Sequence, residues 1–375
     1  MKFDSNWLEK ATAEAYELLL TLAQIPAPSG MEEKRAAFCH DWLTEAGAEG
    51  VYIDQAKNVI YPIGDRGDNP LVVIMAHSDV VFPDLTPLPL RVEDGKIHCP
   101  GVGDDTANAV AVMMAAKYVA QNKLIPGETG LLLVVNSCEE GLGNLRGTRA
   151  LMDRYGDRIT EFISLDGGRN SIMDEAVGSH RYKIEVETEG GHSFGAFGNR
   201  NAIAYLASLI DTLYTMKVPD MGRTTYNVGT ISGGTSVNTI AQHAEMLYEY
   251  RSDVREALEI MKKHLMAAVE FYRAKGVEVK VTLLGDRPCS GDVDPLAKQA
   301  LFNRTAAILN RHFGVEPGHS SGSTDCNIPL SLGIPAVCLG GFRGSGVHTR
   351  EEYLEIDSIP EGIGLALDLT LQYFE

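Results

Sequence analysis

Two patterns of hydrophobic and polar residues alternate along most of the chain. Apolar residues at helical spacing occur at about 5–24, 31–46 and 107–121, where they predict amphipathic helices. Short, uninterrupted apolar runs occur at 71–76 and 130–136. Such runs are typical of strands that are buried on both faces. The pattern therefore predicts an α/β fold with a mixed central sheet flanked by helices.

The remaining elements of this sheet follow from the same pattern. A helix is expected at about 145–155, a strand at 162–165, and a late strand at 334–339 that a C-terminal helix follows. Ser29 lies in the break between the first two helices, and we expect it to cap the second one.

The middle of the chain shows a different pattern. Residues 181–190 alternate between apolar and polar, as in a strand with one solvent-exposed face. The helix, two strands, helix and strand expected next lie at about 201–214, 224–231, 244–251, 253–275 and 277–284. The order β-α-β-β-α-β is that of a ferredoxin-like α+β domain. We therefore expect a discontinuous main domain at 1–177 and 287–375, and an inserted domain at 178–286.

Composition narrows the class of protein. The 375 residues are 44% hydrophobic and 22% charged, as is ordinary for a globular protein. The net charge of −18 disfavours nucleic acid and anionic lipid as partners. No stretch reaches the roughly 20 apolar residues of a membrane span, and the N-terminal segment lacks the apolar region of a signal peptide. Six scattered cysteines without a CxxC pair indicate free thiols, so we expect a cytoplasmic protein.

Side chains that bind metals follow the predicted strands or precede the helix at 107–121. They are His77, Asp79, Asp104, Glu139, Glu140, Asp166 and His348. In open α/β sheets, ligands bind beyond the carboxyl ends of the strands, so we expect these side chains to meet at one edge. Taken singly, each has an ordinary explanation, such as a helix cap, an exposed turn or a loop histidine. Their joint occurrence favours a shared site.

The residue types fit a two-metal hydrolytic site. His77 and Asp79 are two residues apart, so they point the same way on a strand, and Asp79 can fix the tautomer of His77. The two carboxylate oxygens of Asp104 can bridge two metal ions about 3.5–4 Å apart.

The other residues complete this arrangement. His77 and Asp166 would bind one ion, and Glu140 and His348 the other, leaving each ion an open position. Glu139 lies beside a ligand without being one, and we expect it to act as the general base.

The motifs HSDVVFP, GVGDDT, SCEEGLG, LDGG and GVHTREEY resemble those of the dizinc family that contains peptidase T, aminoacylase, acetylornithine deacetylase and the glutamate carboxypeptidases. The resemblance covers nearly the whole chain, and the ordered set of motifs is specific. It implies a zinc-peptidase-like catalytic domain, an inserted lid and dimerisation domain, a homodimer through that lid, and two Zn²⁺ per subunit, with Co²⁺ or Mn²⁺ as alternatives. By this resemblance, Asp79 orients His77 and Glu139 is the base. The metal ligands that it implies are His77, Asp104, Glu140, Asp166 and His348.

The resemblance also implies four further site residues. His192, in the segment GGHS, would stabilise the oxyanion, often in the partner subunit. Asn238, Arg251 and Gly340 would contact substrate, with Arg251 pairing with a carboxylate. An exposed loop histidine and a surface ion pair are the ordinary explanations for His192 and Arg251.

Two positions are informative within this family: one departs from the usual residue, and the other differs between branches of the family. Thr106 stands where the family usually has a lysine. Asp166 is a ligand position where aminopeptidase members usually carry Asp and carboxypeptidase and deacetylase members Glu. We therefore expect amide hydrolysis of short peptides by an aminopeptidase, close to the tripeptidase branch. A carboxypeptidase, an N-acyl-amino-acid deacylase, and an inactive peptide-binding or scaffolding relative are the alternatives.

Overall fold

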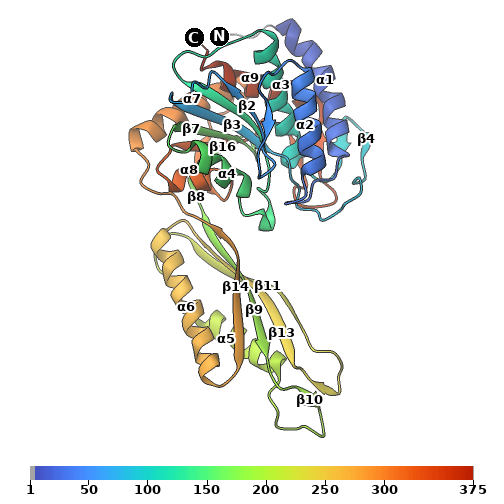
Figure 1. Cartoon of the computed structure of the whole chain (residues 1–375), viewed down its shortest axis with the longest axis vertical. Coiled ribbons are helices and arrows are strands. Elements are labelled where there is room, and N and C mark those ends of the chain that lie inside the picture. The colour runs from blue at the N-terminus through green and yellow to red at the C-terminus, as the bar shows by residue number, and fades with distance from the viewer. Residues whose placement is uncertain (1–4, 375) are drawn as a thin grey trace. The chain divides into compact units, whose positions relative to one another are not determined.

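The structure is a computed structural model that describes residues 5–374, so the ends of the domain predicted at 1–177 and 287–375 lie outside the described residues. The chain divides into two compact units. The first runs up to Ala176 and resumes at Gly291, and the second is Val177–Ser290. Both ends of the described chain therefore belong to the first unit, as the blue and red segments of Figure 1 show.

The first unit is built on a mixed eight-stranded sheet of order β1-β2-β6-β3-β7-β16-β8-β15. Its strands are β1 (Tyr52–Ile53), β2 (Val59–Ile63), β3 (Leu71–His77), β6 (Gly130–Asn136), β7 (Ile159–Leu165), β8 (Ser171–Ala176), β15 (Gly318–Gly322) and β16 (Ala336–Leu339). β3 pairs in parallel with β6 and β7, and β7 pairs in parallel with β16. The carboxyl ends of these four strands therefore share one edge, and the predicted mixed central sheet is confirmed.

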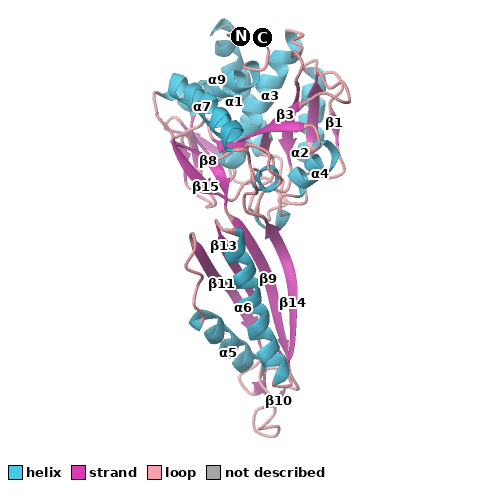
Figure 2. Cartoon of the chain, turned by 90° about the vertical axis from the view of Figure 1, so that its left-hand side faces the viewer, coloured by secondary structure: helices cyan, strands magenta, loops and turns pink. Residues whose placement is uncertain are grey.

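Helices cover both faces of this sheet (Figure 2). On β3, Val72 and Ile74 belong to one apolar core, whereas Val73 and Met75 belong to the other. The first core also takes in α1 (Ser5–Ala23), α2 (Glu33–Glu45), α3 (Ala107–Gln121), α7 (Pro295–Phe313) and α9 (Ile359–Leu371). The second takes in α4 (Arg146–Tyr155) and α8 (Asn327–Ser331). Burial on both faces explains why these strands are continuously apolar in sequence.

A small antiparallel sheet lies beside the site described below. It is formed by β17 (Gly344–Ser345), β18 (Tyr353–Glu355), β5 (Lys96–His98) and β4 (Arg91–Glu93), in that order. The short helices η1 (Val102–Thr106), η2 (Gly141–Gly143) and η3 (Ile356–Ser358) complete the first unit.

The second unit has the element order of a ferredoxin-like α+β domain. Its elements are β9 (Gly178–Glu187), β10 (Gly191–His192), α5 (Ala202–Thr215), β11 (Thr224–Gly233), β12 (Thr239–Ile240), β13 (His243–Ser252), α6 (Arg255–Ala274) and β14 (Glu278–Arg287). The antiparallel sheet has the order β11-β13-β9-β14, and β10 and β12 form a separate ribbon. Apolar side chains of β9 and β13 pack with α5 and α6 in a core of their own.

The prediction for Ser29 is wrong. The residue before α2 is Glu32, whose side chain makes no capping hydrogen bond, and the Ser29 hydroxyl instead donates to Asp79 Oδ2 at 2.5 Å. The six cysteines are free thiols in buried positions, as expected. Within residues 5–374, no helix combines the length and apolarity that a membrane crossing requires.

Candidate metal centre

The shared edge of the sheet brings together the side chains that follow its strands. His77 is the last residue of β3, Asp166 follows β7 directly, and Glu140 lies in the loop after β6. Asp104 comes from η1, just before α3, and His348 from the loop between β17 and β18. All five predicted ligands belong to the first unit.

Asp104 lies between two histidines. Its Oδ1 is 3.1 Å from His77 Nε2, and its Oδ2 is 3.0 Å from His348 Nε2. His348 Nε2 is also 2.9 Å from Glu140 Oε1. Each oxygen of one carboxylate therefore faces a different imidazole, which is the arrangement that a carboxylate bridging two metal ions requires.

Two groups of candidate ligand atoms share His77. One consists of His77, Asp104 and Glu140, and the other of His77, Asp105 and Asp166, with ligand atoms within 4.8 Å of one another in each. In the second group, Asp105 Oδ2 accepts the backbone N–H of His77 at 2.9 Å. Asp105 was not among the predicted ligands, and this contact gives it a positioning role for His77.

The charges of the site fit a bound cation. Burial, together with the negative charge of Asp104, raises the pKa of Asp166 to about 7. Hydrogen bonds to Asp104 and Glu140 raise the pKa of His348 to about 10. Burial is the main cause of the first shift and hydrogen bonds to carboxylates of the second, and the negative charge of Asp104 contributes to both. Divalent ions would offset this concentration of carboxylates. Imidazole and carboxylate donors suit zinc and related metals.

The contacts of Asp79 differ from those expected. Its Oδ1 is 3.6 Å from His77 Nδ1, too far for a hydrogen bond, and His77 Nδ1 lies 3.0 Å from the backbone oxygen of Asp79 instead. The carboxylate accepts the N–H groups of Glu139 and Glu140, both at 2.9 Å. Burial opposes its ionisation, but the contacts with His77, Ser29 and Glu140 N–H outweigh burial and lower its pKa. Asp79 thus holds the loop that carries Glu139 and Glu140.

Glu352 is a positioning residue that sequence reasoning missed. It is 1% exposed and lies four residues after His348. Its carboxylate accepts the backbone N–H groups of Gly101 at 2.5 Å, Gly103 at 2.8 Å and Asp104 at 2.9 Å. One short segment therefore supplies His348 and also fixes the loop of Asp104. The sequence hints at this residue through the acidic pair in TREEY. The backbone N–H groups that Glu352 accepts, however, lie about 250 residues away in the chain.

Sequence reasoning also missed Arg35, because its hydrogen-bond partners at the site lie far from it in the sequence. The residue is 2% exposed, and its guanidinium donates to the backbone oxygen of Ser78, between His77 and Asp79, at 2.7 Å. It also reaches the hydroxyl of Thr106 at 3.3 Å. A buried cation from α2 therefore contacts both the end of β3 and the start of α3.

A cavity of about 260 Å³ lies beside Asp104 and Asp166. Its other walls come from α3, from the loop after β7, and from the segment around β17 and β18. The other residues that line the cavity are Gly103, Asn108, Gly167, Gly168, Phe342, Arg343, Gly344, Ser345, Val347, Glu352, Tyr353 and Leu354. A substrate bound at the metal centre would have this cavity as a neighbouring subsite.

Three of the predicted substrate residues belong to the second unit. His192 is exposed, and its Nδ1 accepts the backbone N–H groups that follow it in its loop. Its segment lies beside that of Asn238, because Ser193 N–H donates to Asn238 O at 2.9 Å. Arg251, on β13, pairs with Glu249 at 3.1 Å, the surface ion pair named above as its ordinary explanation.

Gly340, the fourth predicted substrate residue, follows β16 in the first unit. Its N–H donates to Gly168 O at 3.0 Å. A Cβ at Gly340 would come within 1.6 Å of Gly167 O, so only glycine fits this approach of two loops.

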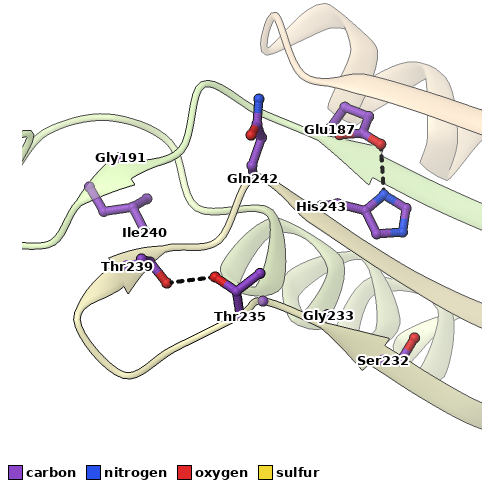
Figure 3. Close-up of a pocket in the computed structure, with 10 residues that line it drawn as sticks. Glu187, Gly191, Ser232, Gly233, Thr235, Thr239, Ile240, Gln242 and His243 are labelled. Atoms are coloured by element: carbon purple, nitrogen blue, oxygen red, sulfur yellow. Dashed lines mark hydrogen bonds and ion pairs between the residues drawn. The ribbon is translucent and has the colours of Figure 1, made fainter.

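The second unit contains a larger cavity of about 600 Å³ (Figure 3). β12 and the end of β11 line it, together with Glu187 and His243, whose side chains pair at 2.6 Å. His243 also forms a group of candidate metal ligands with Glu185 and Glu245. Lys183 lies within 3.1 Å of both of these carboxylates and Lys280 lies 3.6 Å from Glu185, so two ammonium groups already offset the two negative charges.

The fold and the donor set define a metal-dependent hydrolase. Comparison with known proteins agrees: the profile of peptidase family M20/M25/M40 matches residues 73–372. The chain therefore belongs to that family.

Relatives show the range of reactions within this family. The chain is 25% identical to a succinyl-diaminopimelate desuccinylase from Corynebacterium glutamicum in an alignment of 353 residues that covers 91% of each protein. It is 23% identical to carboxypeptidase G2 from a Pseudomonas species, over 88% of this chain and 79% of that one. A tripeptidase structure from Staphylococcus aureus matches with a TM-score of 0.73 and 21% identity, over 96% of this chain and 97% of the other.

Proposed function

We propose that this protein is a dizinc aminopeptidase that removes the N-terminal residue of short peptides, with Co²⁺ or Mn²⁺ as alternative metals. The observation that carries the metal assignment is the position of Asp104, whose two oxygens face His77 and His348. The aminopeptidase assignment is supported by Asp166, because the aminopeptidase branch that the sequence resembles carries Asp there.

The five ligands divide between two ions. His77 and Asp166 would hold one, Glu140 and His348 the other, and Asp104 would bridge them. When bound, the ions supply Lewis-acid stabilisation of the charge that develops on the scissile carbonyl oxygen. The remaining chemistry is carried by side chains of the protein.

Glu139 moves the proton. It adjoins Glu140, is 5% exposed, and its backbone is held by Asp79. Its carboxylate takes a proton from the attacking water and passes it to the nitrogen of the leaving amine.

In this proposal the second unit is a lid and dimerisation domain, and the protein is a cytoplasmic homodimer. His192 would donate to the oxyanion, and Asn238 and the backbone of Gly340 would contact the peptide. Arg251 would bind the C-terminal carboxylate of a tripeptide, exchanging its present partner Glu249 for it.

A second candidate is a carboxypeptidase or an N-acyl-amino-acid deacylase. The desuccinylase and carboxypeptidase relatives favour it, and Arg251 suits a substrate carboxylate in either case.

The test compares trialanine, its N-acetyl form and its C-terminal amide on zinc-loaded protein. Cleavage of trialanine and the amide but not of the acetylated peptide establishes the aminopeptidase. Loss of cleavage on amidation indicates a carboxypeptidase, and release of acetate indicates a deacylase. No turnover of any of them would contradict the proposal and favour a peptide-binding relative.

A further inference from the structure

The turn at residues 137–140, which carries Glu139, contains a residue in an unfavourable backbone conformation. Cys138 has a φ of 59°, in the left-handed region that residues with a Cβ disfavour. It is 2% exposed and directly precedes Glu139, so its conformation sets the direction in which the chain runs into Glu139. Such a conformation persists only where the surrounding structure holds it. The contacts of Cys138 therefore bear on the position of Glu139.

Glu32 binds Cys138 from the segment that precedes α2. Glu32 is fully buried, and its Oε1 accepts the backbone N–H of Cys138 at 3.1 Å and the thiol S–H at 3.2 Å. The same oxygen accepts the N–H of Gly30 at 2.6 Å. On the other side, the carbonyl oxygen of Cys138 accepts the N–H of Leu145 at 2.9 Å. Cys138 is thus held at both peptide groups, and a buried carboxylate is the partner at its N–H.

Two buried carboxylates share the backbone of this turn. Asp79 accepts the N–H groups of Glu139 and Glu140, and Glu32 accepts the N–H that comes just before them. Three consecutive N–H groups are therefore bound by two side chains from distant parts of the chain. Without Glu32, the N–H of the proposed ligand Glu140 would still be held by Asp79. The contact of Glu32 thus lies on the Glu139 side of the turn.

Lys57 balances the charge of Glu32. Its ammonium group lies 3.4 Å from Glu32 Oε2 and 2.7 Å from Glu33 Oε1, and it donates to Gly30 O. A buried carboxylate requires a partner of this kind. Glu33 is exposed and pairs with Lys57, whereas Glu32 contacts both Lys57 and Cys138. The two neighbouring glutamates therefore allow the contact with Lys57 to be tested apart from the contact with Cys138.

We propose that Glu32 is a positioning residue for proton transfer: by holding Cys138 in its left-handed conformation, it keeps the Glu139 carboxylate where it takes the proton of the attacking water. This inference rests on the proposed function, in which Glu139 is the base. A general base must lie within hydrogen-bond reach of the proton it abstracts. A displacement of about 1 Å can cost roughly 100-fold in rate. Glu32 therefore acts on turnover, through Glu139, rather than on the binding of metal or peptide.

The test separates turnover from binding. The kcat and KM for trialanine are measured per folded, zinc-loaded molecule, with the metal content taken from mass spectrometry. Glu32→Ala should lower kcat by about 10–100-fold and leave KM within about twofold of the wild-type value. Glu32→Gln should keep kcat within about threefold of the wild-type value, because its amide oxygen still accepts the N–H of Cys138.

Glu33→Ala is the matched control, because it removes the exposed partner of Lys57 and leaves the contacts between Glu32 and Cys138 in place. It should leave kcat and KM unchanged. If Glu32→Ala yields no folded protein, Glu32→Asp is read in the same way, since its carboxylate lies one methylene farther from Cys138.

An unchanged kcat in Glu32→Ala, or an effect confined to KM or metal content, would overturn the inference. A loss of kcat that Glu32→Gln does not restore, or that Glu33→Ala shares, would overturn it as well. The proposed function fails differently, because wild-type protein that releases no alanine from trialanine ends both. If the wild type is active and Glu139→Gln abolishes turnover but Glu32→Ala leaves kcat unchanged, the function stands and the positioning role is wrong.

Discussion

Asp104 contacts histidines that are separated by about 270 residues in sequence, and three carboxylates outside the proposed ligand set hold the surrounding backbone. Glu352 fixes its backbone, Asp105 fixes the backbone of His77, and Asp79 fixes the loop of Glu139. Each contact joins a carboxylate to backbone N–H groups. The site therefore contains two sets of carboxylates: the proposed metal ligands, and those that hold the backbone on which the ligands and Glu139 lie.

Glu139→Gln should lower kcat for trialanine by about 10²–10⁴-fold, because the amide cannot accept the proton of the attacking water. Metal content should stay at the wild-type value, because Glu139 is not a ligand in this account. Stopped assays of alanine release and mass spectrometry of bound metal check both. Retained activity would show that another group is the base.

Glu352→Gln should weaken metal binding by about 10–100-fold, as loss of a partner behind the ligands typically does. The amide keeps one acceptor but turns an N–H donor toward the N–H groups that Glu352 now accepts. Glu351→Gln is the control, because Glu351 is the exposed neighbour. Competition with a fluorescent chelator measures the affinity, and equal values for the two variants would contradict the role given to Glu352.

At the scale of elements, periodicity located the buried segments well. The helix expected at 107–121 coincides with α3, and the strand expected at 130–136 with β6. Both are apolar almost throughout, so local pattern alone defines them. α7 was not predicted, although Asp294 caps it and Gly314 ends it, and β8 and β15 were missed because SIMDEA and GHSSG carry little apolar signal.

Local sequence pattern also explains which residues of the candidate site could be predicted. Three of the predicted ligands, His77, Glu140 and Asp166, end or follow parallel strands of the sheet, which brings them together, whereas Asp104 precedes α3 and His348 follows β17. Arg35 and Glu352 act through contacts that depend on packing between distant segments. Ser29 was misassigned because a short-range capping rule competed with a contact to Asp79, fifty residues away.

Gly340→Ala should destabilise the first unit by about 1–3 kcal/mol or more, because the new methyl group would collide with the oxygen of Gly167 and force the two loops apart. Gly168→Ala is the control, since a Cβ there meets no atom within 4 Å. Urea denaturation measures both. A Gly340→Ala protein as stable as the control would show that the loops separate at little cost.

At the scale of the whole molecule, the chain consists of two units with separate apolar cores. The proposed catalytic residues in the first unit need nothing from the core of the second in order to be positioned. The second unit carries His192, Asn238 and Arg251 on its own sheet and loops.

A fragment of residues 177–290 should therefore fold alone and unfold in one cooperative transition. Tyr250, Leu265 and Val186 are buried within this unit, and thermal unfolding followed by near-ultraviolet circular dichroism reports on the packing of its tyrosines. A gradual transition would mean that the second unit depends on the first for its fold.

In the proposed function, the two carboxylate oxygens of Asp104 would each bind one of two metal ions. Crystals of zinc-loaded protein measured above and below the zinc absorption edge test this assignment directly. Two anomalous peaks are expected about 3.5–4 Å apart on either side of the Asp104 carboxylate, one near His77 and Asp166, the other near Glu140 and His348. A single peak, or two peaks that Asp104 does not join, would contradict it.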